Sequence, residues 1–348
     1  MSEKICGEAR TSCASTAIKF KSVIDRTPKA NNFVYFLIFI CIIIAMLFLF
    51  GCGEEDNADK PIVSSGEREP VFSPDGKYIA YSIKPQYEIF LFEMATEESE
   101  YLTDGSLPDW SPDGKEIIYV KDANIYKINV ETKEIRQLTT WGDCFFPDWA
   151  PNGVRIAFDT GHDDPKGAHM LWLMDTNGTN FKDISIHGTG EWREAEWSPS
   201  GNRLAHIRYI GVTFREIFVM DSSGQNSVRL TNNQVDDYHP AWSPDGSKII
   251  YVSATHIANE MPDYFVHNIW VMDTKGTDKT QLTWEYGNYN GAYNPTWSPD
   301  GNQIAYVKGE SFEKKNEIEI IYNLWMMDAD GGNKRQLTGK VIETFGCK

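Results

Sequence analysis

A short motif that reads Trp-Ser-Pro-Asp-Gly, or a close variant of it, recurs along most of the chain. The aromatic residues that open the copies lie 38, 39, 48, 45 and 55 residues apart. A period of this length predicts an array of repeats, in a propeller or a solenoid, rather than one irregular domain. The aromatic positions are Phe72, Trp110, Trp149, Trp197, Trp242 and Trp297.

Each repeat predicts four antiparallel strands. Proline and glycine in Pro-Asp-Gly fit a tight turn, which folds the aromatic strand back on an apolar segment such as Ile79-Ala80-Tyr81. A third strand has the pattern of Ile269-Trp270-Val271-Met272-Asp273, and a fourth carries Gln-Leu-Thr, as in Gln281-Leu282-Thr283. No helical periodicity separates these segments, so the pattern favours a propeller over a helical solenoid.

The predicted fold class is therefore all-β, a six-bladed β-propeller of four-stranded antiparallel blades preceded by one membrane-anchoring apolar helix. The last repeat carries its own Gln336-Leu337-Thr338, so closing the ring requires no borrowed strand. Residues 61–67 or 341–348 could still seal the seam. The predicted segments are a cytoplasmic or signal n-region (1–32), a transmembrane helix or lipoprotein signal core (33–50), a linker (51–66), the propeller (67–340) and a tail (341–348).

These combined motifs resemble the propeller of the TolB family, over about four fifths of the chain. The resemblance is weakest where Phe72 replaces tryptophan and where Ser200 replaces the aspartate of the turn. TolB proteins carry an additional α/β domain before the propeller, and the interval from Cys52 to Glu69 is too short to hold one. The resemblance thus implies the fold but not automatically the role of TolB in the cell envelope.

Residues 33–50 form an uncharged run of Phe, Ile and Leu. A helix of this length spans roughly 27 Å, close to the hydrocarbon thickness of a bilayer. Basic residues precede the run and acidic residues follow it, which predicts a propeller exported from the cytoplasm, periplasmic or on the cell surface, and tethered to a membrane. Gly51-Cys52 resembles a lipobox, so Cys52 is a candidate lipidation site and a retained helix is the alternative.

Charge and cysteine content exclude several classes of function. The net charge is −17, and residues 1–50 contribute about +3 of it, so the exported body is strongly acidic and a poor partner for nucleic acid. Only Cys144 and Cys347 belong to that body, which implies no disulfide framework, although the two could pair. No Gly-x-Ser-x-Gly motif or glycine-rich phosphate loop occurs, and no cofactor is expected.

Aromatic and acidic residues gather in the predicted links between blades. The loops between second and third strands are short in the first two repeats and longer in the other four, for example Ser253 to Asn268. Binding is therefore expected on the face of the propeller that carries these loops. Rings in polar loops are expected to be partly exposed and to form a recognition platform, although any single ring could simply fill a gap between blades. The candidate residues are Trp141, Phe145, Phe146, Trp192, Tyr238, Trp284, Tyr286, Tyr289, Asp236 and Asp237.

A metal-dependent enzyme is the alternative. No histidines have the paired spacing of a metal site, but His187, His206 and His239 could converge from several blades, as in the propeller polysaccharide lyases that the repeats also resemble. The acidic body would repel an acidic glycan. We therefore expect a non-catalytic scaffold that binds a protein or peptide partner in the envelope, with a metal-dependent lyase or hydrolase of envelope or extracellular polysaccharide as the alternative and a small-molecule or glycan ligand left open.

Overall fold

A computed structural model describes residues 62–339, apart from residues 163–166, 186–189, 212–213, 258–263, 288–289 and 314–317. The expectations for residues 1–52, including the apolar run and Cys52, and those for Cys347 lie outside the described residues. Every regular element of the described part is a β-strand. No helix long and apolar enough to cross a membrane occurs among these residues.

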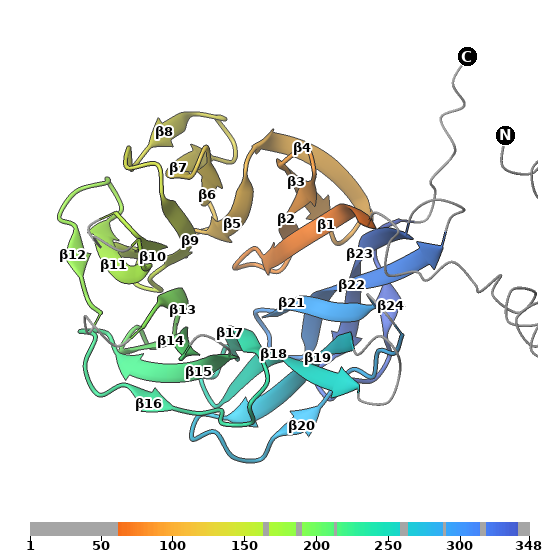
Figure 1. The fold of residues 1–348 in the computed structure, drawn as a ribbon. Helices are drawn as coiled ribbons and strands as arrows, with labels where there is room; N and C mark the ends of the chain where they lie inside the picture. Colours follow the sequence, from red (N-terminus) through yellow and green to blue (C-terminus); the bar gives the residue numbers. More distant parts are fainter. Residues whose placement is uncertain are drawn as a thin grey trace, which may run out of the picture. The chain divides into compact units, whose positions relative to one another are not determined.

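The strands fall into consecutive antiparallel groups of four, as the repeats predict, arranged around a central axis (Figure 1). Each group is called a sheet below, although parallel bridges join three of them into one twelve-stranded sheet. The first sheet comprises β1 (Ile62–Phe72), β2 (Tyr78–Lys84), β3 (Glu88–Glu93) and β4 (Glu98–Asp104), and the next β5 (Ser106–Trp110), β6 (Glu116–Lys121), β7 (Asn124–Asn129) and β8 (Ile135–Gln137). The third comprises β9 (Cys144–Trp149), β10 (Arg155–Thr160), β11 (Met170–Asp175) and β12 (Lys182–Asp183).

The remaining strands repeat this plan. They are β13 (Trp192–Trp197), β14 (Arg203–Ile210), β15 (Phe214–Asp221), β16 (Val228–Arg229), β17 (Asp237–Trp242), β18 (Lys248–Ile257), β19 (Tyr264–Asp273), β20 (Thr280–Gln281), β21 (Gly291–Trp297), β22 (Gln303–Glu313), β23 (Ile318–Asp328) and β24 (Arg335–Gln336). The first strand of each sheet lies nearest the axis and the fourth lies outermost (Figure 1).

The Ser-Pro-Asp-Gly turn closes the first hairpin of a sheet by a fixed set of hydrogen bonds. In the turn after β17, the Asp245 carboxylate accepts from Ser243 Oγ at 2.6 Å and from the Ser247 amide at 3.0 Å. Ser243 Oγ in turn accepts from the Lys248 amide at 2.9 Å. Gly246 adopts φ +70°, a left-handed conformation that glycine reaches at no steric cost. The motif is therefore a turn signal, as the sequence predicts.

The hydrophobic cores lie between neighbouring sheets. The tryptophan that opens a repeat packs against the third strand of the preceding sheet, so that Trp242 shares a core with Val219. Phe72 of the first sheet shares a core with Leu324 and Met326 of the last. The first and last sheets are thus neighbours, as two consecutive sheets are.

The N-terminal half of β1 covers the seam between these sheets. Residues Ile62 to Gly66 pair in parallel with Ile318 to Tyr322 of β23, while the rest of β1 pairs antiparallel with β2. Residues 62–66 thus join the first and last sheets, and they lie within the segment 61–67 that the sequence analysis offered for this role. Gly66 is required here, because its φ is +113° and a Cβ would collide with the Tyr322 carbonyl oxygen.

Candidate functional site

The first strands all carry the same irregularity at the axis. Each has a β-bulge that shifts its register against the second strand, and each bulge begins with a non-glycine residue at φ between +47° and +55°. Such a conformation costs of order 1–3 kcal/mol, so its recurrence indicates a built feature. The residues in this conformation are Glu69, Leu107, Phe146, Glu194, His239 and Asn294.

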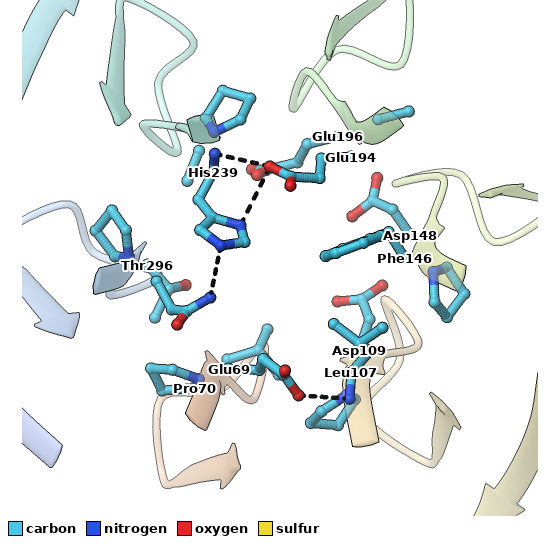
Figure 2. Close-up of a pocket in the computed structure, with 18 residues that line it drawn as sticks. Glu69, Pro70, Leu107, Asp109, Phe146, Asp148, Glu194, Glu196, His239 and Thr296 are labelled. Carbon is cyan, nitrogen blue, oxygen red and sulfur yellow. Dashed lines mark hydrogen bonds and ion pairs between the residues drawn. The ribbon is translucent and has the colours of Figure 1, made fainter. Parts of the chain in front are cut away.

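These bulge residues surround a pocket of about 190 Å³ on the axis, which we call the axial pocket. A proline follows the bulge residue in every first strand except β13, where Ala195 takes its place. The next residue also faces the pocket, and in β5, β9 and β13 it is an acid, namely Asp109, Asp148 or Glu196. Figure 2 shows Asp109, Asp148 and Phe146 on one side of the pocket and His239 across from them.

Each of these three acids accepts a hydrogen bond from a backbone amide of the next sheet. Asp109 Oδ2 accepts from the Trp149 amide at 2.7 Å, and Asp148 Oδ2 accepts from the Trp197 amide at 2.7 Å. Glu196 Oε1 accepts from the Trp242 amide at 3.0 Å. In the described part of the chain no cation forms an ion pair with any of the three. When they ionise, these acids therefore have no cationic partner on their side of the pocket.

The environment opposes the ionisation of these groups. Burial raises the pKa of Asp109 to about 7 and that of Glu196 to about 8. Burial, and then the charges of Asp109 and Glu196, hold the pKa of Asp148 well above its usual value. Three carboxylates that cannot easily ionise together are the condition under which a bound cation is favoured.

The other charged groups of the axial pocket are compensated. Glu194 Oε2 accepts from the His239 amide at 2.8 Å and lies 3.2 Å from His239 Nδ1. His239 Nε2 lies 3.2 Å from Asn294 Nδ2, so both ring nitrogens have neighbours (Figure 2). Glu69 Oε2 accepts from the Leu107 amide at 2.8 Å, and Glu69 Oε1 lies 3.5 Å from Lys84 Nζ. Free acceptor capacity is thus concentrated at Asp109, Asp148 and Glu196.

The predicted recognition residues do not form one cluster. Phe146 lines the axial pocket, whereas Phe145 points to a neighbouring hollow. Trp284 and Tyr286 are 55% and 72% exposed and lie between β20 and β21. Tyr289 lies outside the described residues.

The remaining predicted residues contact neighbouring side chains of the fold. Trp141 stacks on His162, with ring centroids 4.6 Å apart, and Asp236 pairs with Arg215 at 2.8 Å. The expectation of partial exposure is wrong for the rings of Trp192 and Tyr238, which are 0% and 6% exposed, and Asp237 is buried as well. These three lie on β13 and β17 rather than in links, because the first strands begin earlier than the sequence pattern suggests.

The histidines proposed for a metal site are not drawn together in the described residues. His206 is fully buried and stacks on Trp192, with ring centroids 4.6 Å apart, and burial lowers its pKa to about 3. His239 lines the axial pocket, and His187 lies outside the described residues. Among the described residues no group of three or more His, Cys, Asp or Glu side chains could hold a metal ion.

Two of the predicted long loops are largely strands. Residues 253–257 pair with 264–268, and residues 308–313 pair with 318–323, as extended arms of β18–β19 and β22–β23. The sequence reasoning also missed Asp109, Asp148 and Glu196 as site residues. A signal was present, since the residue before the aromatic anchor is acidic in only these repeats and is Val71, Ala241 or Thr296 in the others.

Comparisons with known proteins agree with this architecture. The family model described as TolB beta propeller domain matches residues 56–215 and 190–320. An uncharacterized protein of Agrobacterium fabrum (strain C58 / ATCC 33970) is 28% identical over 228 residues, 59% of this chain and 76% of that protein. The Tol-Pal system protein TolB of Francisella tularensis subsp. mediasiatica (strain FSC147) is 28% identical over 211 residues, 57% of this chain and 46% of TolB.

The chain therefore spans about half the length of the TolB relative. A solved structure from Agrobacterium tumefaciens, assigned as TolB, has a TM-score of 0.58 at 21% identity and covers 72% of this chain and 88% of that one. At this identity the likeness shows the fold. The family model, however, matches well over half of the residues, and the chain belongs to the TolB β-propeller domain family.

Proposed function

We propose that the described sheets are the blades of one six-bladed propeller that acts, without catalysis, as a binding scaffold in the cell envelope. Its axial pocket holds a basic segment of a protein or peptide partner. Residues 33–50, or a lipid on Cys52, tether the propeller outside the cytoplasm. The relatives named as Tol-Pal system proteins support a role of this kind.

Three acids of the axial pocket that lack a cationic partner carry the proposal. Asp109, Asp148 and Glu196 face the pocket with amide donors but no cation. A lysine or arginine of a partner would lower the repulsion among them and would gain charge-assisted hydrogen bonds. The acidic exported body would also speed the encounter with a basic partner.

Peptide binding to the full-length chain in detergent tests the axial site. The probe is acetyl-Gly-Lys-Gly-Ala-Gly-amide, compared with the same peptide carrying glutamate in place of lysine, by calorimetry. We expect only the lysine peptide to bind, and Asp148→Asn and Glu196→Gln each to weaken it by about tenfold, the scale of one charge-assisted bond. Glu134→Gln, an exposed carboxylate outside the pocket, is the matched control. Equal binding of both peptides would overturn the proposal.

Protein processing tests the tether. Mass spectrometry of the chain purified from membranes should show either residues 1–51 removed and a lipid on Cys52, or an intact N-terminus. Cys52→Ala abolishes processing in the first case and leaves the mass otherwise unchanged in the second. Recovery of the unlipidated, processed propeller in the soluble fraction would contradict a membrane tether.

A further inference from the structure

A second hollow, which we call the side pocket, adjoins the axial pocket. It has a volume of about 480 Å³ and lies among the first three sheets. This volume is within the range of about 300–1,000 Å³ that is typical of ligand sites. Its lining includes Tyr87, Gly105, Val120, Lys121, Ala123 and Phe145.

The side pocket is open because the connections around it are short. β2 ends at Lys84 and β3 begins at Glu88, while Asp122 and Ala123 alone join β6 to β7, both with positive φ. Gly105 also lines the pocket, and a Cβ there would lie 2.5 Å from the buried Tyr119 ring, so this wall carries no side chain. The extended arms of β18–β19 and β22–β23 belong to other sheets.

Lys121 and Asp104 at the side pocket pair with each other, whereas the exposed Asp122, which also lines it, forms no ion pair among the described residues. Lys121 Nζ lies 3.0 Å from Asp104 Oδ2, and Asp104 Oδ1 accepts from Tyr101 Oη at 2.8 Å. Tyr87 is 52% exposed, and the ring centroids of Phe145 and His169 lie 5.8 Å apart. The lining thus combines two aromatic rings with one ion pair and one exposed carboxylate, and the rings suit an aromatic side chain.

The two pockets meet through consecutive residues. Ser106 and Phe145 line the side pocket, and the residues that follow them, Leu107 and Phe146, line the axial pocket. Consecutive Cα atoms are about 3.8 Å apart, so one extended peptide can reach both pockets with side chains a few residues apart. The left-handed conformation of Leu107 and Phe146 is what turns neighbouring side chains into different pockets.

We propose that the partner is an extended peptide segment with a lysine or arginine in the axial pocket and an aromatic residue, one to three positions away, in the side pocket. This assignment rests on the proposed function of the axial pocket and adds the second anchor and the path of the chain. The path leaves the axis over the short connections of the first two sheets. Charge complementarity selects the basic residue, and the contiguous pockets select an extended segment.

Peptide pairs test the second anchor on the full-length chain in detergent. In acetyl-Gly-Lys-Gly-Phe-Gly-amide and its relatives, phenylalanine stands one, two or three positions before or after lysine, and each is compared with the peptide that has alanine in its place. We expect at least one spacing to bind about tenfold more tightly with phenylalanine than with alanine, since burial of such a ring is worth about that factor or more.

The variant Tyr87→Ala should reduce this gain below about threefold while leaving the affinity of the lysine-alanine peptide unchanged. Phe312→Ala, a similarly exposed ring on β22, is the control and should leave the gain intact. A phenylalanine gain that is absent at every spacing, or that survives Tyr87→Ala, would overturn the side pocket even with lysine-dependent binding retained. Loss of the lysine dependence itself would overturn the proposed function instead.

Discussion

Asp148 lies between two other acids of the axial pocket, and its pKa is raised first by burial and then by Asp109 and Glu196. A carboxyl group with a raised pKa keeps its proton in the folded chain at a pH where the unfolded chain has released it. The folded state then binds more protons, so the free energy of unfolding falls as the pH rises from about 4 through the folded-state pKa values. These values reach about 7 for Asp109 and about 8 for Glu196.

Asp148→Asn should therefore stabilise the protein more at pH 8 than at pH 5, because the raised pKa of Asp148 favours its neutral form at the lower pH. One pKa unit corresponds to about 1.4 kcal/mol, so we expect a gain in the free energy of unfolding of about 1 kcal/mol or more at pH 8. Thermal unfolding at both pH values measures it. Glu134→Gln makes the same charge change at an exposed site and should show no such difference. An equal effect of Asp148→Asn at both pH values would contradict the argument.

At the scale of elements, the turn between the third and fourth strands packs on the preceding sheet. Gly276 follows β19 with φ +79°, and a Cβ there would lie 2.5 Å from the Leu230 carbonyl oxygen. Gly178 and Gly331 repeat this contact with Leu138 and Leu282. The leucine of the Gln-Leu-Thr signature thus packs against the glycine turn of the next sheet. This contact explains why the Gln-Leu-Thr motif and the glycine turn recur together.

Gly276→Ala should destabilise the chain by about 2–3 kcal/mol, because it adds a clash to the cost of a left-handed alanine. Gly153→Ala is the matched control, since Gly153 has φ +70° and a Cβ there would meet nothing within 4 Å. The control should lose only about 1 kcal/mol. Urea unfolding of both variants separates the two contributions. Equal losses would show that the contact with Leu230 is unimportant.

The sequence predicts the regular parts of these elements well. The strand pattern and the Pro-Asp-Gly turns, as at Asp245, depend on local preferences that recur in each repeat, and the sheets of four strands are confirmed. The arms were predicted as loops because they extend beyond the motif that recurs in every repeat, although Tyr264, Phe265 and Val266 are residue types common in strands. Residue types alone therefore did not set the ends of these strands.

The site was harder to predict for a different reason. The bulge that aims His239 or Phe146 at the axis is a left-handed conformation in residues that rarely adopt it, so neither propensity nor periodicity signals it. Trp192 was expected to be exposed because its surroundings are polar, but it is fully buried against His206. Strand register decides which face of a sheet a ring occupies, so the polarity of its neighbours in sequence does not show whether the ring is exposed.

At the scale of the whole propeller, the seam joins the first and last sheets through contacts of different kinds. β1 pairs in parallel with β23, and Arg335 Nη1 of β24 lies 2.9 Å from Oε1 of Glu97, in the turn before β4. A Cβ on Gly76 would come within 3.7 Å of Pro299, as one on Gly114 would of Pro74 between ordinary neighbours. The seam therefore has the same glycine–proline contact as the boundary between ordinary neighbours, and it adds the N-terminal part of β1 as a strand paired with β23.

Gly66→Val should open that added strand. Its side chain would collide with Tyr322 and would require a left-handed valine, so we expect residues 62–66 and 318–322 to exchange their amide hydrogens at least tenfold faster, by mass spectrometry. Glu97→Gln removes the exposed ion pair of the same seam and should leave exchange there within about threefold. Unchanged exchange in Gly66→Val would show that the strand does not hold the seam.

The bulge in the first strands sets the backbone conformation around the axial pocket, whereas the side chain that it carries sets the chemistry of the lining. The backbone kink is the same at Glu69, Leu107 and Asn294, although these side chains are an acid, an alkyl group and an amide. The backbone conformation of the bulge therefore does not require one particular side chain. Single substitutions can therefore change the lining of the pocket. Paralogues can acquire new ligand preferences in this way while they keep the same backbone framework.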